Sequence, residues 1–460
     1  MAFSPRIAEQ RFGYGLSPLV APPADIAQML AGVAGPDRMQ DRFGIDGFRD
    51  LQSQNVVFRR FIKQARDDAG TADGAAALEK QKAVLSQVRA DYARWFAQFQ
   101  LRRINTQDGF RERLVAFWGD HFTAMGKQAL IRYGAPVFVE EAVRPHVGGR
   151  FADMLIAAVR HPLMLHYLDQ DSSIGPNSNS AKRRGMMQGL NENLAREVLE
   201  LHTLGVGGPY TQKDVRALAN LLTGLGRTAD FSFRFRPNIA EPGVQDVLGV
   251  TYDPQVSMAR IEEVLGDLAA HPATAAHIAQ KLAVHFVSDT PPPDLVAALR
   301  DAYLGSDGDL LTVYTALLEH PEAWAPPARN IRPPDEFVSA ALRALAVPAD
   351  VIAGLPARRI ANLFFGPLRL MGQDWFRPGG PDGWEEEDVA WVTPQGMAGR
   401  LEWAMRVPKA LLKQLPEPND VVRNALGDNP PQKVVFAAAA AESRSEAIGL
   451  ILMSPAFQRR

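Results

Sequence analysis

The chain of 460 residues contains no cysteine. This absence excludes disulfide bonds, thiolate nucleophiles, zinc–thiolate centres and iron–sulfur clusters. An excess of charge of one sign is also missing, because 50 basic and 52 acidic residues give a formal net charge of -2. We therefore expect neither a nucleic acid nor an acidic membrane surface as a partner.

Long apolar runs are absent as well. No uninterrupted stretch of about 18 apolar residues occurs, so the sequence predicts no membrane-spanning helix. The first residues, MAFSPRIAEQRFGYGLSP, lack the basic start and apolar run of a signal peptide. This favours a cytoplasmic location, with periplasmic export together with a partner as the alternative. The motifs of P-loops, of zinc proteases (His-Glu-x-x-His) and of serine hydrolases (Gly-x-Ser-x-Gly) are not found.

The dominant pattern along the chain is a helical period of apolar residues. Strand-like alternation is scarce, and its best example is 231–237, which we expect to form a small hairpin with 244–252. The sequence therefore predicts a mainly α protein, a large multi-helix globular domain with a minor β-hairpin element near 231–252. The clearest helical stretches are 78–104, 111–130, 214–225, 258–270, 273–287, 294–304, 309–320 and 336–347.

Residues typical of helix ends divide these stretches. Thr211 and Asp214 resemble a capping box. His-Pro dipeptides at 161–162, 271–272 and 320–321 follow apolar runs, and a proline suits the first turn of a new helix. No clear linker separates independent domains. We predict a helical main domain over 1–330, which contains the candidate site, and a C-terminal helical subdomain over 331–460 packed on it.

The run NENLAREVLELHTLG at 191–205 carries the strongest candidate site. On a helix, Leu194, Ala195, Val198, Leu199 and Leu201 share one side, and Asn193 and the charged residues share the other. One interpretation is a salt-bridged surface, with Arg196 between two carboxylates. The other is a metal or acid–base site, because three carboxylates share one arginine and His202 turns toward the apolar side. The charged residues are Glu192, Arg196, Glu197 and Glu200.

A second cluster, FWGDHF at 117–122, places Asp120 and His121 among aromatic side chains. The two side chains point about 100° apart on a helix, and either can be a ligand, a base or a hydrogen-bonded core group. On the stretch 273–287, His277 and His285 lie two turns apart, too far to chelate one ion without other ligands. We interpret that stripe as a polar helix face.

These segments resemble a bacterial family known only as a domain of unknown function, DUF1800. The resemblance covers almost the whole chain, and the run at 191–215 is its most specific part. It implies a protein often encoded beside a second uncharacterised protein that carries an export signal. Further matching segments are RFGYGLSP at 11–18, LVAFWGDHF at 114–122, HPLMLHYLD at 161–169 and HPATAAHIAQKLAVHFV at 271–287.

This chain departs from the family pattern just before Val-Leu-Gly at 247–249. The pattern usually has His-Asp-x-Gly-x-Lys there, whereas this chain has AEPGVQ. Ala240 stands for the histidine, Glu241 for the acid and Gln245 for the lysine. If that histidine carries chemistry in relatives, this protein has lost or changed it.

Two hypotheses follow. The first is a metal-dependent hydrolase, in which Glu197, His202, Arg196 and His121 are catalytic and a divalent metal is held by Glu192, Glu197, Glu200 and Asp120. The second is a non-catalytic helical scaffold or escort that binds a partner protein encoded nearby. A carbohydrate or polymer binder, based on the irregular segment with Trp375 and Trp384, is a third option. The substrate is left open, and the long polar loop at 171–190 is either a lid or a surface loop.

Overall fold

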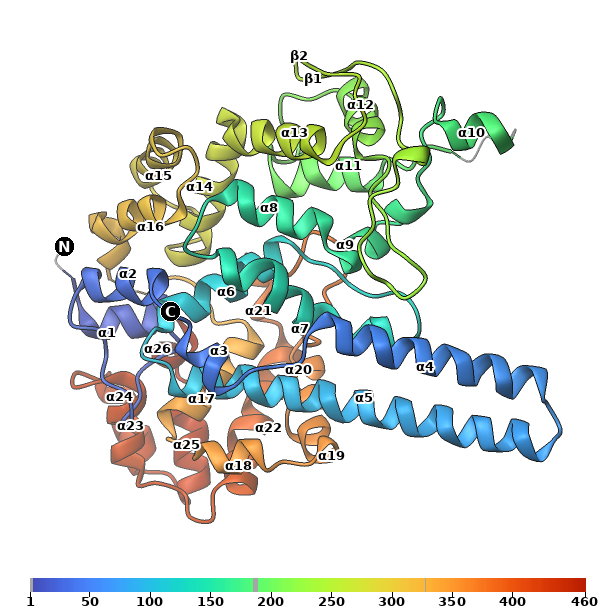
Figure 1. Ribbon diagram of the computed structural model, residues 1–460. Coiled ribbons are helices and arrows are strands. Elements are labelled where there is room, and N and C mark those ends of the chain that lie inside the picture. The colour runs from blue at the N-terminus through green and yellow to red at the C-terminus, as the bar shows by residue number, and fades with distance from the viewer. Residues whose placement is uncertain (1–2, 185–188, 327) are drawn as a thin grey trace.

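The computed structural model of the protein describes residues 3–184, 189–326 and 328–460. Helices dominate this part of the chain, which confirms the predicted mainly α fold (Figure 1). Its only strands, β1 (Gln245–Val247) and β2 (Val250–Tyr252), form one antiparallel pair. No helix within the described ranges is long and apolar enough to cross a membrane.

The hairpin is shorter than the sequence predicts. Both strands lie within 245–252, and Leu248 and Gly249 turn between them with φ of 51° and 81°. Positive φ at both central residues is typical of a two-residue type I′ turn. The stretch 231–237 was the wrong partner, because its backbone hydrogen-bonds instead to the glycine-bearing loop at 224–228. Gly224 has a φ of 97°, so that loop does not form a regular strand.

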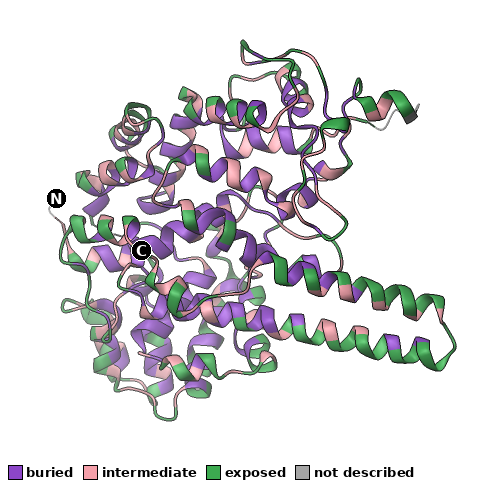
Figure 2. Ribbon diagram, in the orientation of Figure 1, coloured by how far each residue is buried: buried purple, intermediate pink, exposed green. Residues whose placement is uncertain are grey.

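The centre of the molecule is α6 (Gly109–His121), with the inner half of α5 (Ala72–Asn105) beside it. Helix α4 (Phe48–Asp67) runs antiparallel to α5, and together they project from the body as a long arm (Figure 1). Side chains on the outer turns of the arm are exposed, whereas those near the body are buried (Figure 2). The arm thus begins in the core and ends in solvent.

The other elements surround this centre. The N-terminal and middle segments contribute α1 (Pro5–Ile7), η1 (Ala8–Phe12), α2 (Ile26–Ala34), α3 (Arg38–Arg42), η2 (Ala129–Tyr133), α7 (Ala135–Phe138), η3 (Val139–Val143), η4 (Arg144–His146), α8 (Phe151–Arg160), α9 (Pro162–Tyr167), η5 (Gln170–Ser172), α10 (Asn179–Arg184), α11 (Asn193–Glu197), η6 (Val198–His202), α12 (Gln212–Leu222), η7 (Pro237–Ile239) and α13 (Met258–Ala270). Residues 185–188 of the polar loop at 171–190 lie outside the described residues.

The C-terminal part lies below the centre in Figure 1 and continues the same apolar core. Its elements, with those that precede it, are α14 (Pro272–Phe286), α15 (Pro293–Gly305), α16 (Leu310–Glu319), η8 (Pro321–Trp324), α17 (Pro334–Ala344), α18 (Ala349–Ala353), α19 (Ala357–Ile360), η9 (Ala361–Phe365), α20 (Gly366–Leu370), α21 (Asp388–Trp391), α22 (Pro394–Leu411), α23 (Pro418–Leu426), α24 (Gln432–Ala439), α25 (Arg444–Met453) and α26 (Pro455–Gln458).

The predicted helix junctions are confirmed. At each His-Pro dipeptide the proline is the first residue of a helix, namely α9, α14 and η8. The Nδ1 atom of each histidine accepts a hydrogen bond from the backbone N–H two residues later, at 3.0–3.3 Å. The histidine therefore acts as an N-cap, and the proline removes one donor that the helix would leave unpaired. The capping box of Thr211 and Asp214 is also present, at the start of α12.

Helix α17 ties the two predicted domains together. It begins just after the predicted boundary at residue 330, and all of its residues are buried. Three ion pairs join it to the N-terminal part: Arg103–Asp335 at 2.5 Å, Arg113–Glu336 at 2.6 Å and Glu9–Arg343 at 3.0 Å. The division at residue 330 stays a prediction, but an apolar core and buried ion pairs both continue across it.

Candidate functional site

The acidic face at 192–200 is a salt-bridged surface in this structure. Arg196 lies between Glu192, at 3.7 Å, and Glu200, at 3.3 Å. Gln212 on α12 extends this network, because its amide donates to Glu192 (2.7 Å) and its oxygen accepts from Arg196 (3.0 Å). Pairs of this kind on a helix surface stabilise by only about 0.2–0.5 kcal/mol each.

His202 turns away from this face, as the sequence predicts. It closes the π-helical turn η6 and is 1% exposed, and neither ring nitrogen has a hydrogen-bond partner within the described residues. Burial, with the charge of Lys281, lowers the pKa of His202 to about 3, so the ring is neutral at physiological pH. Glu197 is half-buried, and burial together with Glu200 raises its pKa.

Asp120 and His121 point in different directions from the end of α6. The Nε2 atom of His121 lies 3.2 Å from the backbone oxygen of His202, and the two imidazole centroids are 6.0 Å apart. Asp120 instead contacts the backbone at Trp384. The structure therefore brings His121 and His202 together, whereas the side chain of Asp120 contacts a different segment.

No three His, Asp or Glu side chains gather in a way that holds a metal ion anywhere in the described ranges. The arrangement thus gives no support to a metal at Glu192, Glu197, Glu200 and Asp120. Catalytic roles for Glu197, His202, Arg196 and His121 stay predictions.

A cavity with an open mouth lies beside α6 and α17, lined also by the irregular segment at 373–386. Its walls are largely apolar and aromatic, as in most small-molecule sites. The acidic and basic side chains that line it are Arg103, Asp120, His285, Asp335, Glu336, Glu385 and Glu386.

Asp120 is held at the edge of this cavity by the backbone. The N–H of Trp384 donates to both carboxylate oxygens, at 3.0 and 3.1 Å. Gly383, with a φ of 83°, lets the chain approach so closely that a Cβ there would lie 2.5 Å from Asp120 Oδ2. Burial, reinforced by the charge of Glu386 and opposed by that of Lys281, raises the pKa of Asp120 to about 7. Asp120 therefore carries a proton for part of the time at neutral pH.

Glu386 lines the same cavity in the opposite state. Its carboxylate lies 2.8 Å from Nδ1 of His285. Burial opposes ionisation, but His285 and the nearby charges of Arg460 and Lys281 outweigh it and lower the pKa of Glu386 to about 2. One cavity thus holds a carboxyl that is partly protonated near neutrality and another that is ionised.

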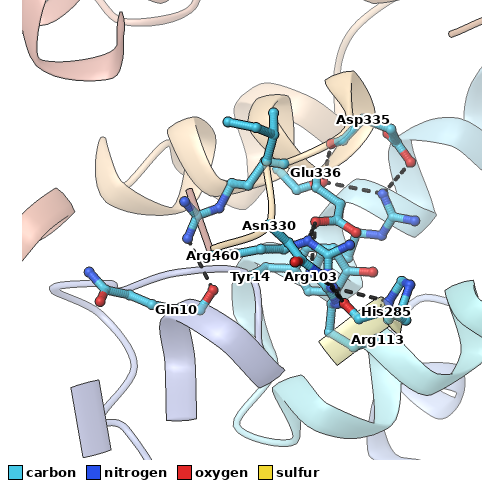
Figure 3. Close-up of polar contacts among 12 residues, drawn as sticks. Gln10, Tyr14, Arg103, Arg113, His285, Asn330, Asp335, Glu336 and Arg460 are labelled. Carbon is cyan, nitrogen blue, oxygen red and sulfur yellow. Dashed lines mark hydrogen bonds and ion pairs between the residues drawn. The ribbon is translucent and has the colours of Figure 1, made fainter. Parts of the chain in front are cut away.

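A buried ion network contacts His285 (Figure 3). Arg113 lies 3.1 Å from Nε2 of His285 and 2.6 Å from Glu336, and Arg460 also pairs with Glu336, at 3.1 Å. Because a guanidinium only donates, Nε2 of His285 accepts, and Nδ1 carries the hydrogen that is donated to Glu386. The network therefore fixes the tautomer of His285 and the orientation of Glu386.

Two members of this site were missed from the sequence. His285 was assigned to a polar helix face, and this interpretation is wrong, because the residue is buried and lines the cavity. Glu386 sits in a run of three glutamates within an irregular segment, where nothing distinguishes it from its neighbours. Only the fold brings it to His285, 101 residues away.

The positions that depart from the family pattern form a separate polar cluster. Glu241 is buried and accepts hydrogen bonds from the backbone N–H and the side-chain amide of Asn177, at 2.8 and 2.6 Å. Gln245 accepts from Asn220 at 3.0 Å, and Ala240 is buried. The acid is thus part of a satisfied structural network here.

The chain belongs to the family described as protein of unknown function (DUF1800), whose model matches residues 8–459. The resemblance seen in the sequence is therefore confirmed. Neither the comparison with curated proteins nor that with solved structures finds a match. The family assigns no reaction, so function has to be argued from the site.

Proposed function

We propose that the protein is a hydrolase whose acid–base site is the cavity with Asp120 and Glu386. The observation that carries this proposal is that two carboxyls line one cavity in environments that shift their pKa values in opposite directions, upward for Asp120 and downward for Glu386. Environments that push the pKa values of two acids apart are typical of acid–base catalysis, because one acid donates a proton while the other acts as a charge. This proposal keeps the hydrolysis predicted from the sequence. It drops the divalent metal, and it replaces the predicted catalytic residues with Asp120 and Glu386.

The two groups have distinct roles. Asp120 donates its proton to the leaving group as the scissile bond breaks, and the hydroxyl of water joins the other side of the cleaved bond. The second proton of that water returns to Asp120, so both carboxyls end each turnover as they began. Glu386 stays ionised and stabilises positive charge, while His285 holds it in place. The proposal assigns no step to a metal ion.

The test is hydrolysis of a panel of nitrophenyl glycosides, esters and phosphates by the untagged protein. We expect Asp120→Asn and Glu386→Gln to lower any activity found by about 10²–10⁴-fold. Glu387→Gln is the matched control, because Glu387 is exposed and does not line the cavity. The proposal is overturned if no substrate is hydrolysed, or if the first two variants keep the rate of the control.

The α4–α5 arm favours a second candidate function, the scaffold or escort. Its outer turns expose the apolar side chains of Ile62 and Leu78 by 39% and 43%. An exposed apolar patch on a projecting arm is typical of a binding surface. In this alternative the partner is the protein encoded nearby, and the two are exported together. Co-purification of both proteins, lost on Ile62→Ser and Leu78→Ser, tests it.

A further inference from the structure

The arginines at and beside the cavity are already paired with carboxylates. Arg103 pairs with Asp335, and Glu336 pairs with both Arg113 and Arg460. A charged ligand would have to compete with these buried pairs, and breaking a buried pair costs more than a surface pair returns. These arginines are therefore not available to bind an anionic ligand.

Aromatic rings supply most of the remaining surface. Trp384, Trp375 and Phe117 line the cavity. Trp384 is partly exposed, and the hydrogen bond from its backbone to Asp120 places it beside the acid. The indole N–H of Trp375 is buried and finds no acceptor within the described residues. A ring with apolar faces and polar edges suits this lining, because its faces stack on aromatic side chains while its edges bind polar groups.

The sign of the charge at the site also distinguishes acyl transfer from acetal cleavage. Acyl transfer builds a negative oxygen and needs free N–H donors around it. Arg103 donates to Asp335 and the N–H of Trp384 donates to Asp120, so neither is free to bind such an oxygen. The indole N–H of Trp375 is a single buried donor. Cleavage of an acetal builds positive charge on carbon, which an ionised carboxylate stabilises. Glu386 thus fits the second class.

We propose that the substrate is a neutral glycoside whose sugar ring stacks on Trp384, with its glycosidic oxygen toward Asp120. The bond between the anomeric carbon and this oxygen breaks, and the oxygen takes the proton of Asp120. Water adds its hydroxyl to the anomeric carbon, its remaining proton restores Asp120, and Glu386 stabilises the positive carbon in between. This inference rests on the proposed hydrolase function and names its substrate class.

The experiment measures binding and cleavage separately. Calorimetric titration of the Asp120→Asn variant uses cellohexaose, xylohexaose, maltohexaose and chitohexaose as probes. Cleavage of the same oligosaccharides by the unchanged protein is followed by chromatography. We expect at least one probe to bind and to be cleaved. In the Asp120→Asn background, Trp384→Ala should weaken binding about tenfold or more and Trp384→Phe much less. Phe436→Ala is the control, because this exposed ring lies outside the cavity lining.

The outcomes separate the two proposals. Binding that depends on Trp384 without cleavage supports the sugar ligand and overturns the hydrolase. Hydrolysis of esters or phosphates alone, lost in Asp120→Asn, supports the hydrolase and overturns the glycoside. Absence of binding to all four probes overturns the substrate class. The melting temperature of each variant shows that a lost signal is not a lost fold.

Discussion

Replacing Glu336 with glutamine tests whether the network beneath the cavity is as important to the fold as its geometry indicates. Glu336 is buried and pairs with Arg113 at 2.6 Å and with Arg460 at 3.1 Å. Burial works against its ionisation, but the two guanidinium groups outweigh it and lower the pKa of Glu336. The carboxylate is therefore charged at neutral pH, and glutamine removes that charge with almost no change in shape.

The expected loss of stability follows from the two arginines that remain after the substitution. Arg113 and Arg460 stay buried and keep their positive charges, but their shared carboxylate is gone. Removing one partner of a buried pair typically costs about 3–5 kcal/mol, because the other charge is left uncompensated. We therefore expect Glu336→Gln to lower the free energy of unfolding by about this amount.

Urea unfolding, followed by circular dichroism and tryptophan fluorescence, measures the difference. The matched control is Glu402→Gln, which breaks the exposed pair with Arg406. Exposed pairs contribute about 0–1 kcal/mol, so the control should unfold near the midpoint of the unchanged protein. Equal midpoints for the two variants would refute the reasoning, since they would mean that solvent reaches Glu336 and screens its charge.

Three further predictions concern the site and its surroundings. Gly383→Ala should lower stability by about 1–3 kcal/mol, because φ is 83° and the new Cβ would meet Asp120, whereas Gly379→Ala, with open space around it, should melt unchanged. His202→Leu should make the urea midpoint less sensitive to pH. The neutral ring has a pKa of about 3 in the fold and 6.5 as its ordinary value, so the unfolded chain binds the extra proton and stability falls as pH drops through this window. Hydrolysis should decline as pH rises through about 7, where Asp120 loses its proton, and a pH profile of kcat that rises there contradicts its role as the acid.

Most helices of the fold are predictable from local sequence patterns. Apolar periodicity and capping residues predicted the helices because both act within a few residues along the chain. The hairpin register was not predictable in the same way. Phe231, Phe233 and Phe235 alternate like a strand, but only the tertiary fold decides that their neighbour is the loop at 224–228 and not 244–252.

The candidate site shows the same division. The sequence indicates Asp120 as a candidate because it lies among aromatic residues in a stretch with a clear helical period. Its partner Glu386 and the supporting His285 come from segments far apart, and no local pattern marks such a meeting. The acidic face around Arg196 suggested a site for a local reason. Its charges are close in sequence, and that closeness reflects helix geometry without requiring a ligand.

Energetics explain why the cavity is the better site. The pairs around Arg196 are partly exposed and contribute little either way. The pairs beneath the cavity are buried, and a well-packed apolar core of the same volume is often at least as stable. A fold that nevertheless buries Arg113, Glu336 and Arg460 together gains orientation: the hydrogen of His285 is directed at Glu386, and Glu386 keeps its charge beside the cavity. Orientation of this kind supports the proposal that the cavity is the functional site.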